Sequence, residues 1–178
     1  MNLQNAKILV ASFSRQGKNI TGGGAIVDLP MGNTEVVARM IQEATGGESF
    51  RIEAVHPYPE DYYETTETAK EEQRSNARPE LTAHVENMDA YDVIFVGYPN
   101  WWGTMPMPVF TFLEGYDFAR KTIVPFCTHE GSGLGRSVVD IKALCPQATI
   151  LDGFAVRGGS ATNAQNEVSA WLQKLTTA

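Results

Sequence analysis

The sequence predicts a doubly wound α/β domain, a three-layer sandwich around a five-stranded parallel sheet. Numbered along the chain, the expected strands lie in the order 2-1-3-4-5. Short runs of β-branched and aromatic residues, such as Val93–Gly97, are typical of strands buried on both faces. These runs alternate with helical segments. That alternation implies right-handed crossovers and a mainly parallel sheet covered by helices on both sides.

The first strand and the first helix are separated by an unusually long connection. Residues 7–13 form an apolar run that ends in a polar turn, and residues 18–30 follow without a clear pattern. Gly32 or Asn33 is expected to cap the helix, and Gly46 to end it.

The middle of the chain supplies the next two strands. Residues 49–55 alternate loosely, as an edge strand does, and a Pro-rich turn ends them. The charged segment 60–76 is expected to be a solvated surface helix. Residues 93–98 form the third strand, which Pro99 ends because proline cannot donate to a ladder.

The last third of the chain completes the pattern. Residues 121–127 form the fourth strand, although Pro125 in its interior is awkward there. A fifth, short strand is expected at 149–151, with an extension to Val156. Helices are expected over 106–115, up to residue 144, and up to residue 175.

Length and composition fit one domain, residues 1–178, without an interdomain linker. The net charge of −7 argues against nucleic-acid binding, which needs a basic face. No apolar run approaches the length of a membrane span. Cys127 and Cys145 show neither disulfide-scaffold nor metal-ligand spacing, so reduced core thiols in a cytoplasmic protein are expected.

The strand order brings three loops to one crevice. A switch point lies between the first and third strands, and ligands of such sheets bind beyond the carboxyl ends of the strands there. The loops that follow the first, third and fourth strands converge on this point. They are also the three stretches with unusual chemistry.

The first loop offers groups that suit a phosphate monoester. Ser14 at the strand end and Gly32, Asn33 and Thr34 at the helix start supply hydroxyl and backbone N–H donors. Helix capping alone explains Asn33 and Thr34 equally well. Arg15 either approaches a phosphate or is simply solvated.

The second loop carries Pro99, Asn100, Trp101, Trp102 and Gly103. Tryptophan is costly to expose, so we expect one indole to pack inward and the other to line the crevice. Gly103 permits close backbone approach to a ligand, or a positive φ angle.

The third loop begins with Thr128, His129, Glu130, Gly131 and Ser132. Its glycines let backbone amides approach the edge of a ring. His129 is a surface residue, a hydrogen-bond donor to a ligand carbonyl, or a proton source, and Glu130 has no role that the sequence indicates.

Three other kinds of site are disfavoured. The chain lacks the Gly-x-x-x-x-Gly-Lys-Ser/Thr loop of nucleotide hydrolases, and no Gly-x-Gly-x-x-Gly motif follows the first strand. It also lacks the Gly-x-Ser-x-Gly elbow of serine hydrolases.

With these loops the chain resembles the flavodoxin-like FMN-binding family over essentially its whole length. The match is to a bacterial branch in which Ser14 is separated from Gly32–Thr34 by an insertion, residues 17–30. Typical flavodoxins have a continuous Ser/Thr-x-Thr-Gly-Asn-Thr loop around the FMN phosphate. Pro99–Gly103 and Thr128–Gly133 look like the second and third flavin loops of the family.

The resemblance implies a site for non-covalently bound FMN. Ser14, Asn33 and Thr34 would hold the phosphate, and Trp101 or Trp102 would cover one face of the ring. The backbone around Gly103 would meet the N5 edge of the flavin.

The resemblance leaves three functions open. The favoured one is an electron carrier that cycles FMN between redox states and serves redox partner proteins or small electron acceptors. The second is an NAD(P)H-dependent FMN oxidoreductase or quinone reductase, if residues 18–30 or 58–63 build an extra wall over the flavin. The third is a flavin-free binding module on the same fold.

Overall fold

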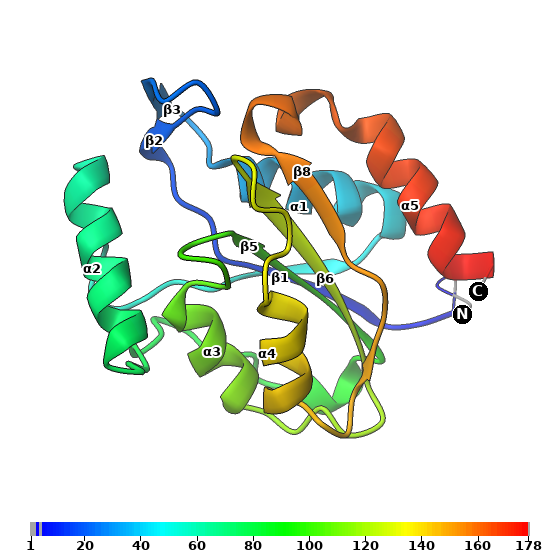
Figure 1. Ribbon diagram of the computed structural model, residues 1–178. Coiled ribbons are helices and arrows are strands. Elements are labelled where there is room, and N and C mark those ends of the chain that lie inside the picture. The colour runs from blue at the N-terminus through cyan, green and yellow to red at the C-terminus, as the bar shows by residue number, and fades with distance from the viewer. Residues whose placement is uncertain (1–2, 4, 178) are drawn as a thin grey trace.

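A computed structural model gives the fold and describes residue 3 and residues 5–177. The main sheet is parallel, in the order β4-β1-β5-β6-β7, with β8 also paired to β6 (Figure 1). Its strands are β1 (Ile8–Ser12), β4 (Glu48–Arg51), β5 (Val93–Pro99), β6 (Thr122–His129), β7 (Thr149–Ile150) and β8 (Phe154–Arg157). The predicted order 2-1-3-4-5 is confirmed, because β7 and β8 together occupy the fifth place.

Pro125 accounts for the division of the fifth strand. The carbonyl groups of Lys121 and Ile123 accept bonds from residues 149 and 151, so alternate residues of β6 face β7 and β8. By this alternation, the backbone of Pro125 also faces the fifth strand, but proline has no N–H to donate to it. The ladder is interrupted there, and pairing resumes only at Phe126 with β8.

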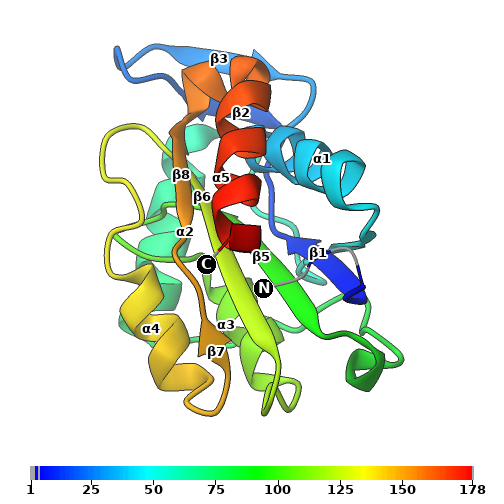
Figure 2. The same cartoon turned by 90° about the vertical axis from the view of Figure 1, so that its right-hand side faces the viewer.

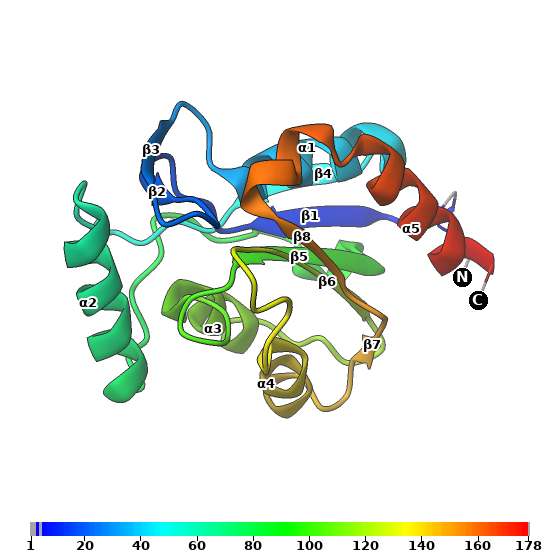
Figure 3. The same ribbon diagram turned by 45° about the horizontal axis from the view of Figure 1, so that its top comes forward.

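Helices cover both faces of the sheet (Figures 2 and 3). One face carries α1 (Asn33–Thr45) and α5 (Gln165–Thr177), and the other carries α3 (Met107–Glu114) and α4 (Ser137–Leu144). Two apolar cores result, one on each side of the sheet. Two short 3-10 segments complete the chain, η1 (Met88–Ala90) and η2 (Gly158–Asn163).

The connection at residues 18–30 is a β-hairpin, which the sequence did not predict. Strands β2 (Gly17–Ile20) and β3 (Ile26–Leu29) pair antiparallel. At the turn, the N–H of Gly24, at φ 83°, donates to the carbonyl of Thr21 at 2.8 Å. The hairpin stands beyond the carboxyl end of the sheet, next to α2 (Tyr62–Arg74) (Figures 1 and 3).

The first two helices begin and end close to the predicted residues. Gly32 is the N-cap of α1, and Gly46 ends it with φ 68°. Asp61 caps α2, since its Oδ1 accepts from the N–H of Glu64 at 3.0 Å. The strand predicted over 49–55 is shorter, because β4 ends at Arg51 and only an isolated bridge, Ala54 to Leu81, continues it.

Both cysteines are buried free thiols, and burial raises the pKa of Cys127 to about 12 and of Cys145 to about 11. The thiolate is the reactive form. We therefore expect the native protein to resist a disulfide reagent such as dithionitrobenzoate at pH 8, and to react at both thiols once unfolded in urea. Rapid modification of the native protein would contradict this burial.

None of the helices in the described part of the chain has the length and apolar content needed to span a bilayer. The same residues contain no cluster of three or more His, Cys, Asp or Glu side chains suited to a metal ion.

Candidate functional site

The loops after β1, β5 and β6 meet around a cavity of about 250 Å³, which we name the inner cavity. Ten of the residues singled out from the sequence line it: Arg15, Asn33, Thr34, Pro99, Asn100, Trp101, Thr128, His129, Glu130 and Ser132. Four further residues complete the lining, namely Asn19, Ile20, Tyr62 and Gly158. The convergence predicted from strand order therefore occurs. Five candidates, Ser14, Gly32, Trp102, Gly103 and Gly131, do not line this cavity.

The amino terminus of α1 presents donors to the inner cavity. A helix cannot satisfy its own first N–H groups, and Glu35 N–H finds the Ser14 hydroxyl oxygen at 3.0 Å. No described residue accepts a hydrogen bond from the N–H group of Asn33 or of Thr34. Two free donors at a helix amino terminus favour an anionic ligand. Ser14 thus accepts from the N–H of Glu35 and leaves the N–H groups of Asn33 and Thr34 without a partner among the described residues.

Gly32 allows β1 and α1 to approach this closely. A Cβ atom at this position would lie 2.2 Å from the Ser14 hydroxyl oxygen and 2.6 Å from the Arg15 carbonyl oxygen. The φ angle of Gly32 is −65°, so its conformation does not require glycine. The absence of a side chain is therefore needed for space.

Thr34 and Thr128 join the first loop to the third. Their hydroxyl oxygens lie 2.7 Å apart, and both side chains are buried. One hydroxyl donates to the other, which leaves the accepting hydroxyl with its own hydrogen to donate. This hydrogen is available to a ligand in the inner cavity, which both residues line.

Asn100 joins the second loop to the third. Its Nδ2 donates to the carbonyl of Gly133 at 2.8 Å, and its Oδ1 accepts from the N–H of Gly103 at 3.0 Å. The Gly103 carbonyl in turn accepts from the N–H of Arg136 at 2.9 Å. Both polar backbone groups of Gly103 are therefore used within the protein, and Gly103 does not line the inner cavity.

Replacement of Asn100 by alanine is expected to lower the free energy of unfolding by about 1–2 kcal/mol, because two loop hydrogen bonds are lost. Asn100→Asp keeps the acceptor for Gly103 but sets a carboxylate oxygen against the carbonyl oxygen of Gly133, so at pH 7 a loss at least as large is expected. Urea denaturation of the flavin-free protein measures both. Equal stability of all three proteins would show that Asn100 does not hold the two loops together.

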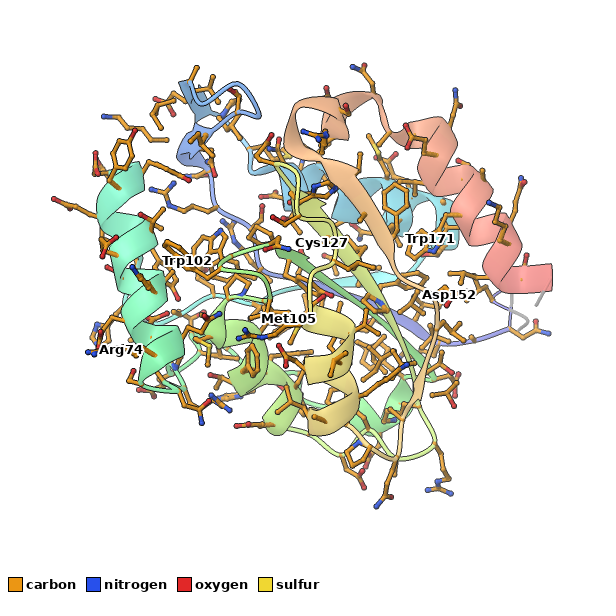
Figure 4. All side chains as sticks on the ribbon, viewed as in Figure 1. Arg74, Trp102, Met105, Cys127, Asp152 and Trp171 are labelled. Carbon is orange, nitrogen blue, oxygen red and sulfur yellow. The ribbon has the colours of Figure 1, made fainter. Side chains whose placement is uncertain are left out.

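The two tryptophans occupy different environments. Trp101 is half-buried and packs edge-on against Phe13 and Tyr58, with ring centroids 5.2 and 5.0 Å away. Trp102 is 46% exposed, and its Nε1 donates to the carbonyl of Thr66 at 2.9 Å. Figure 4 shows Trp102 near α2. Trp101 combines the two expected roles, since it packs against the core and also lines the inner cavity.

The contacts of His129 favour a neutral ring that can donate a hydrogen bond from Nε2. Its Nδ1 accepts from the N–H of Gly131 at 2.9 Å, so in the neutral ring Nε2 carries the proton. Burial, and then the positive charge of Arg157, lower the pKa of His129 below its ordinary value. The neutral ring is therefore favoured at pH 7.

Arg15 connects the hairpin to the segment before α2. Its guanidinium donates to the carbonyl of Lys18, and also to the carbonyls of Pro59 and Glu60 at 2.7 and 2.8 Å. Burial lowers its pKa. The guanidinium is therefore not simply solvated, and its approach to a phosphate stays a prediction.

Glu130 connects the third loop to the hairpin tip. Its carboxylate lies close to the backbone N–H groups of Gly22 and Gly158 and to Arg157. Burial is the largest influence and raises the pKa of Glu130, whereas Arg157 and the two N–H groups oppose that rise. Sequence reasoning missed this contact, because nothing in the chain order brings Gly22 near residue 130.

Comparison with known proteins adds an independent finding. The sequence model of a family described as flavodoxin matches residues 28–175. A candidate flavoprotein from Bacteroides eggerthii is 31% identical, with a TM-score of 0.76 over 95% of this chain and 97% of that one. A similar one from Bacteroides uniformis is 27% identical, with a TM-score of 0.76 over 94% and 98%.

A third structure shares the fold at lower identity. It is a flavoprotein in complex with FMN from Lactobacillus acidophilus, 21% identical, with a TM-score of 0.66 over 90% of this chain and 99% of that one. No curated protein matches the chain.

Proposed function

The chain belongs to the flavodoxin family, and on that premise we propose that it binds FMN non-covalently in the inner cavity and works as an electron-transfer protein. The observation that carries the proposal is the pair of free N–H groups at Asn33 and Thr34, at the amino terminus of a helix that borders the cavity. Such a terminus suits the FMN phosphate.

The residues around the cavity fit the rest of the cofactor. Thr34 and Thr128 together offer one hydroxyl hydrogen to the phosphate or the ribityl chain. Trp101 offers an aromatic wall, and aromatic contact contributes about 1 kcal/mol beyond burial. His129 would offer its Nε2–H as a donor to the bound flavin. Gly32 and Gly158 let protein groups pack closely beside the cavity, since an added Cβ atom would meet Ser14 and Arg15 at the first position and Glu130 and Asn33 at the second.

Bound FMN supplies the redox chemistry, and the protein positions it and sets its potential. The acidic chain, with a net charge of −7, opposes an anionic reduced flavin. Only charges within about 10 Å of the ring count strongly, because salt screens the others. Redox partner proteins or small electron acceptors take the electrons. Buried free thiols support a reducing, cytoplasmic location.

Anaerobic redox cycling tests the proposal. FMN-loaded protein is reduced with dithionite and then mixed with oxidised cytochrome c. An electron carrier passes its electrons on in stoichiometric amount, and NADH or NADPH alone leaves its flavin oxidised. A bound flavin that returns no electrons to cytochrome c would contradict the carrier role.

A second candidate function is a flavin-dependent reductase, and one observation favours it. The hairpin and α2 supply Asn19, Ile20 and Tyr62 to the wall of the inner cavity, which a simple electron carrier does not require. Rapid bleaching of the bound flavin by NADH or NADPH would favour this function over the carrier.

A further inference from the structure

A second cavity of about 390 Å³ adjoins the proposed flavin site, and we name it the outer cavity. It shares six lining residues with the inner cavity: Arg15, Asn19, Ile20, Tyr62, Asn100 and Trp101. Five residues line the outer cavity alone: Tyr63, Thr65, Thr66 and Ala69 of α2, and Trp102. The two cavities are therefore neighbours, with the ring of Trp101 at the border of both.

The two cavities differ in chemistry. The inner one has the helix amino terminus and the third loop, whereas the outer one is lined mainly by aromatic and small side chains. Arg15 is the only charged residue among those that line the outer cavity, and its guanidinium already donates to three backbone carbonyls. No carboxylate of the described chain lines it. This lining suits an uncharged ligand.

Two exposed aromatic side chains stand at the outer cavity. Tyr63 is 62% exposed and Trp102 is 46% exposed, and both belong to the few large apolar side chains that the described surface presents to water. Single exposed apolar side chains scattered over a surface are normal. Exposed apolar side chains gathered beside a cavity more often mark a ligand-binding groove. A flat aromatic ligand would cover both rings.

Trp102 is also held in a strained conformation. Its φ angle is 53°, in a tight turn closed by the bridge between Trp101 and Thr104. A bulky residue rarely adopts this region, in which asparagine or glycine is favoured. The indole is fixed by its bond to Thr66 and by Lys70, whose ammonium lies 5.1 Å from the ring centroid. It therefore forms a rigid wall.

The segment that builds one wall of the outer cavity is net acidic. Residues 60–74, which include α2, contain six acidic side chains and two basic ones. Arg74, one of the two, is paired with Glu71. The phosphates of a dinucleotide would pass this net negative segment, whereas an uncharged molecule meets no such repulsion.

We propose that the outer cavity binds a small, uncharged, planar aromatic molecule beside the flavin. The inference rests on the proposed function in that FMN fills the inner cavity. This ligand would approach the flavin from the outer cavity, which residues of α2 and the hairpin line.

Calorimetric titration of oxidised, FMN-loaded protein with an uncharged naphthoquinone tests the proposal. One molecule is expected to bind per chain, and its sulfonated, anionic analogue at least about tenfold more weakly. Tyr63→Ala removes one aromatic wall and is expected to weaken naphthoquinone binding about fivefold. Ala69→Leu fills the cavity and is expected to weaken it at least about tenfold.

Val139→Ala, at an exposed position of α4 that lines neither cavity, is the control and is expected to change nothing. The FMN dissociation constants of the two outer-cavity variants are expected to stay within about twofold of the parent value. No naphthoquinone binding, or binding that neither variant weakens, would overturn the proposal. An equal loss of FMN binding in both variants would also overturn it, because the outer cavity would then belong to the flavin itself.

The same titration of the flavin-free protein separates this proposal from the function on which it rests. If FMN does not bind but Tyr63→Ala and Ala69→Leu still weaken naphthoquinone binding, the proposed function fails and the outer site stands. If FMN binds and naphthoquinone does not, the outer site fails and the proposed function stands.

Discussion

Replacement of Gly32 by alanine is expected to lower the free energy of unfolding by about 2–3 kcal/mol and to weaken FMN binding at least tenfold. The added Cβ atom would lie 2.2 Å from the Ser14 hydroxyl oxygen and 2.6 Å from the Arg15 carbonyl, so β1 and α1 must move apart. That movement breaks the bond from Glu35 N–H to Ser14 and displaces the donors at Asn33 and Thr34.

Gly23→Ala is the matched control for this substitution. Gly23 lies at the hairpin tip, where the nearest atom to an added Cβ is 3.9 Å away. Urea denaturation of the flavin-free proteins and FMN fluorescence titrations measure the two effects separately. If Gly32→Ala were as stable as the control and bound FMN as tightly, the conclusion that β1 and α1 approach too closely for a side chain at residue 32 would be wrong.

The second large effect is expected at the paired threonines. Thr34→Val removes a hydroxyl from the proposed phosphate site and should raise the FMN dissociation constant roughly 10–100-fold, the range for a hydrogen bond to a charged group. It also leaves the buried Thr128 hydroxyl without its partner at 2.7 Å. A loss of about 1–2 kcal/mol in the free energy of unfolding is expected from that unpaired group.

The double variant Thr34→Val, Thr128→Val separates binding from stability. Replacing both partners by apolar groups of the same shape is nearly neutral for stability, so the free energy of unfolding is expected to recover to within about 1 kcal/mol of the parent value. FMN binding should stay weak. Recovery of both properties would mean that the hydroxyl pair is structural and does not contact the cofactor.

The layers and strand order of the fold were predictable, because buried parallel strands leave a strong local pattern. Pro99 ends β5 as expected. The awkward Pro125 was also visible in the sequence, but its consequence was not. Only the pairing shows that its missing N–H faces the fifth strand and divides it into β7 and β8.

The convergence of three loops was predictable from strand order alone, and ten candidates line the inner cavity. The part of the cavity wall formed by Asn19, Ile20, Tyr62 and Gly158 was not predictable, because it comes from tertiary contacts between segments that carry no motif. The hairpin strands are only four residues long and half-buried at most. Tyr62 and Gly158 reach the cavity through the placement of α2 and η2.

Arg15 shows a limit of another kind. From its position beside the first strand, the sequence left two roles open, approach to a phosphate or simple solvation. The structure shows a guanidinium used by the backbone carbonyls of Lys18, Pro59 and Glu60. Those carbonyls meet only because the hairpin and the segment before α2 come together in space, which the local sequence does not encode.

The most direct test of the account is a fluorescence titration of FMN and of riboflavin with the purified, flavin-free protein. The account predicts that FMN is quenched to saturation at one molecule per chain. It also predicts that riboflavin, which lacks the phosphate, binds at least about tenfold more weakly, because it loses the donors at the start of α1. No quenching of FMN, or equal affinity for the two flavins, would contradict the assignment of the site.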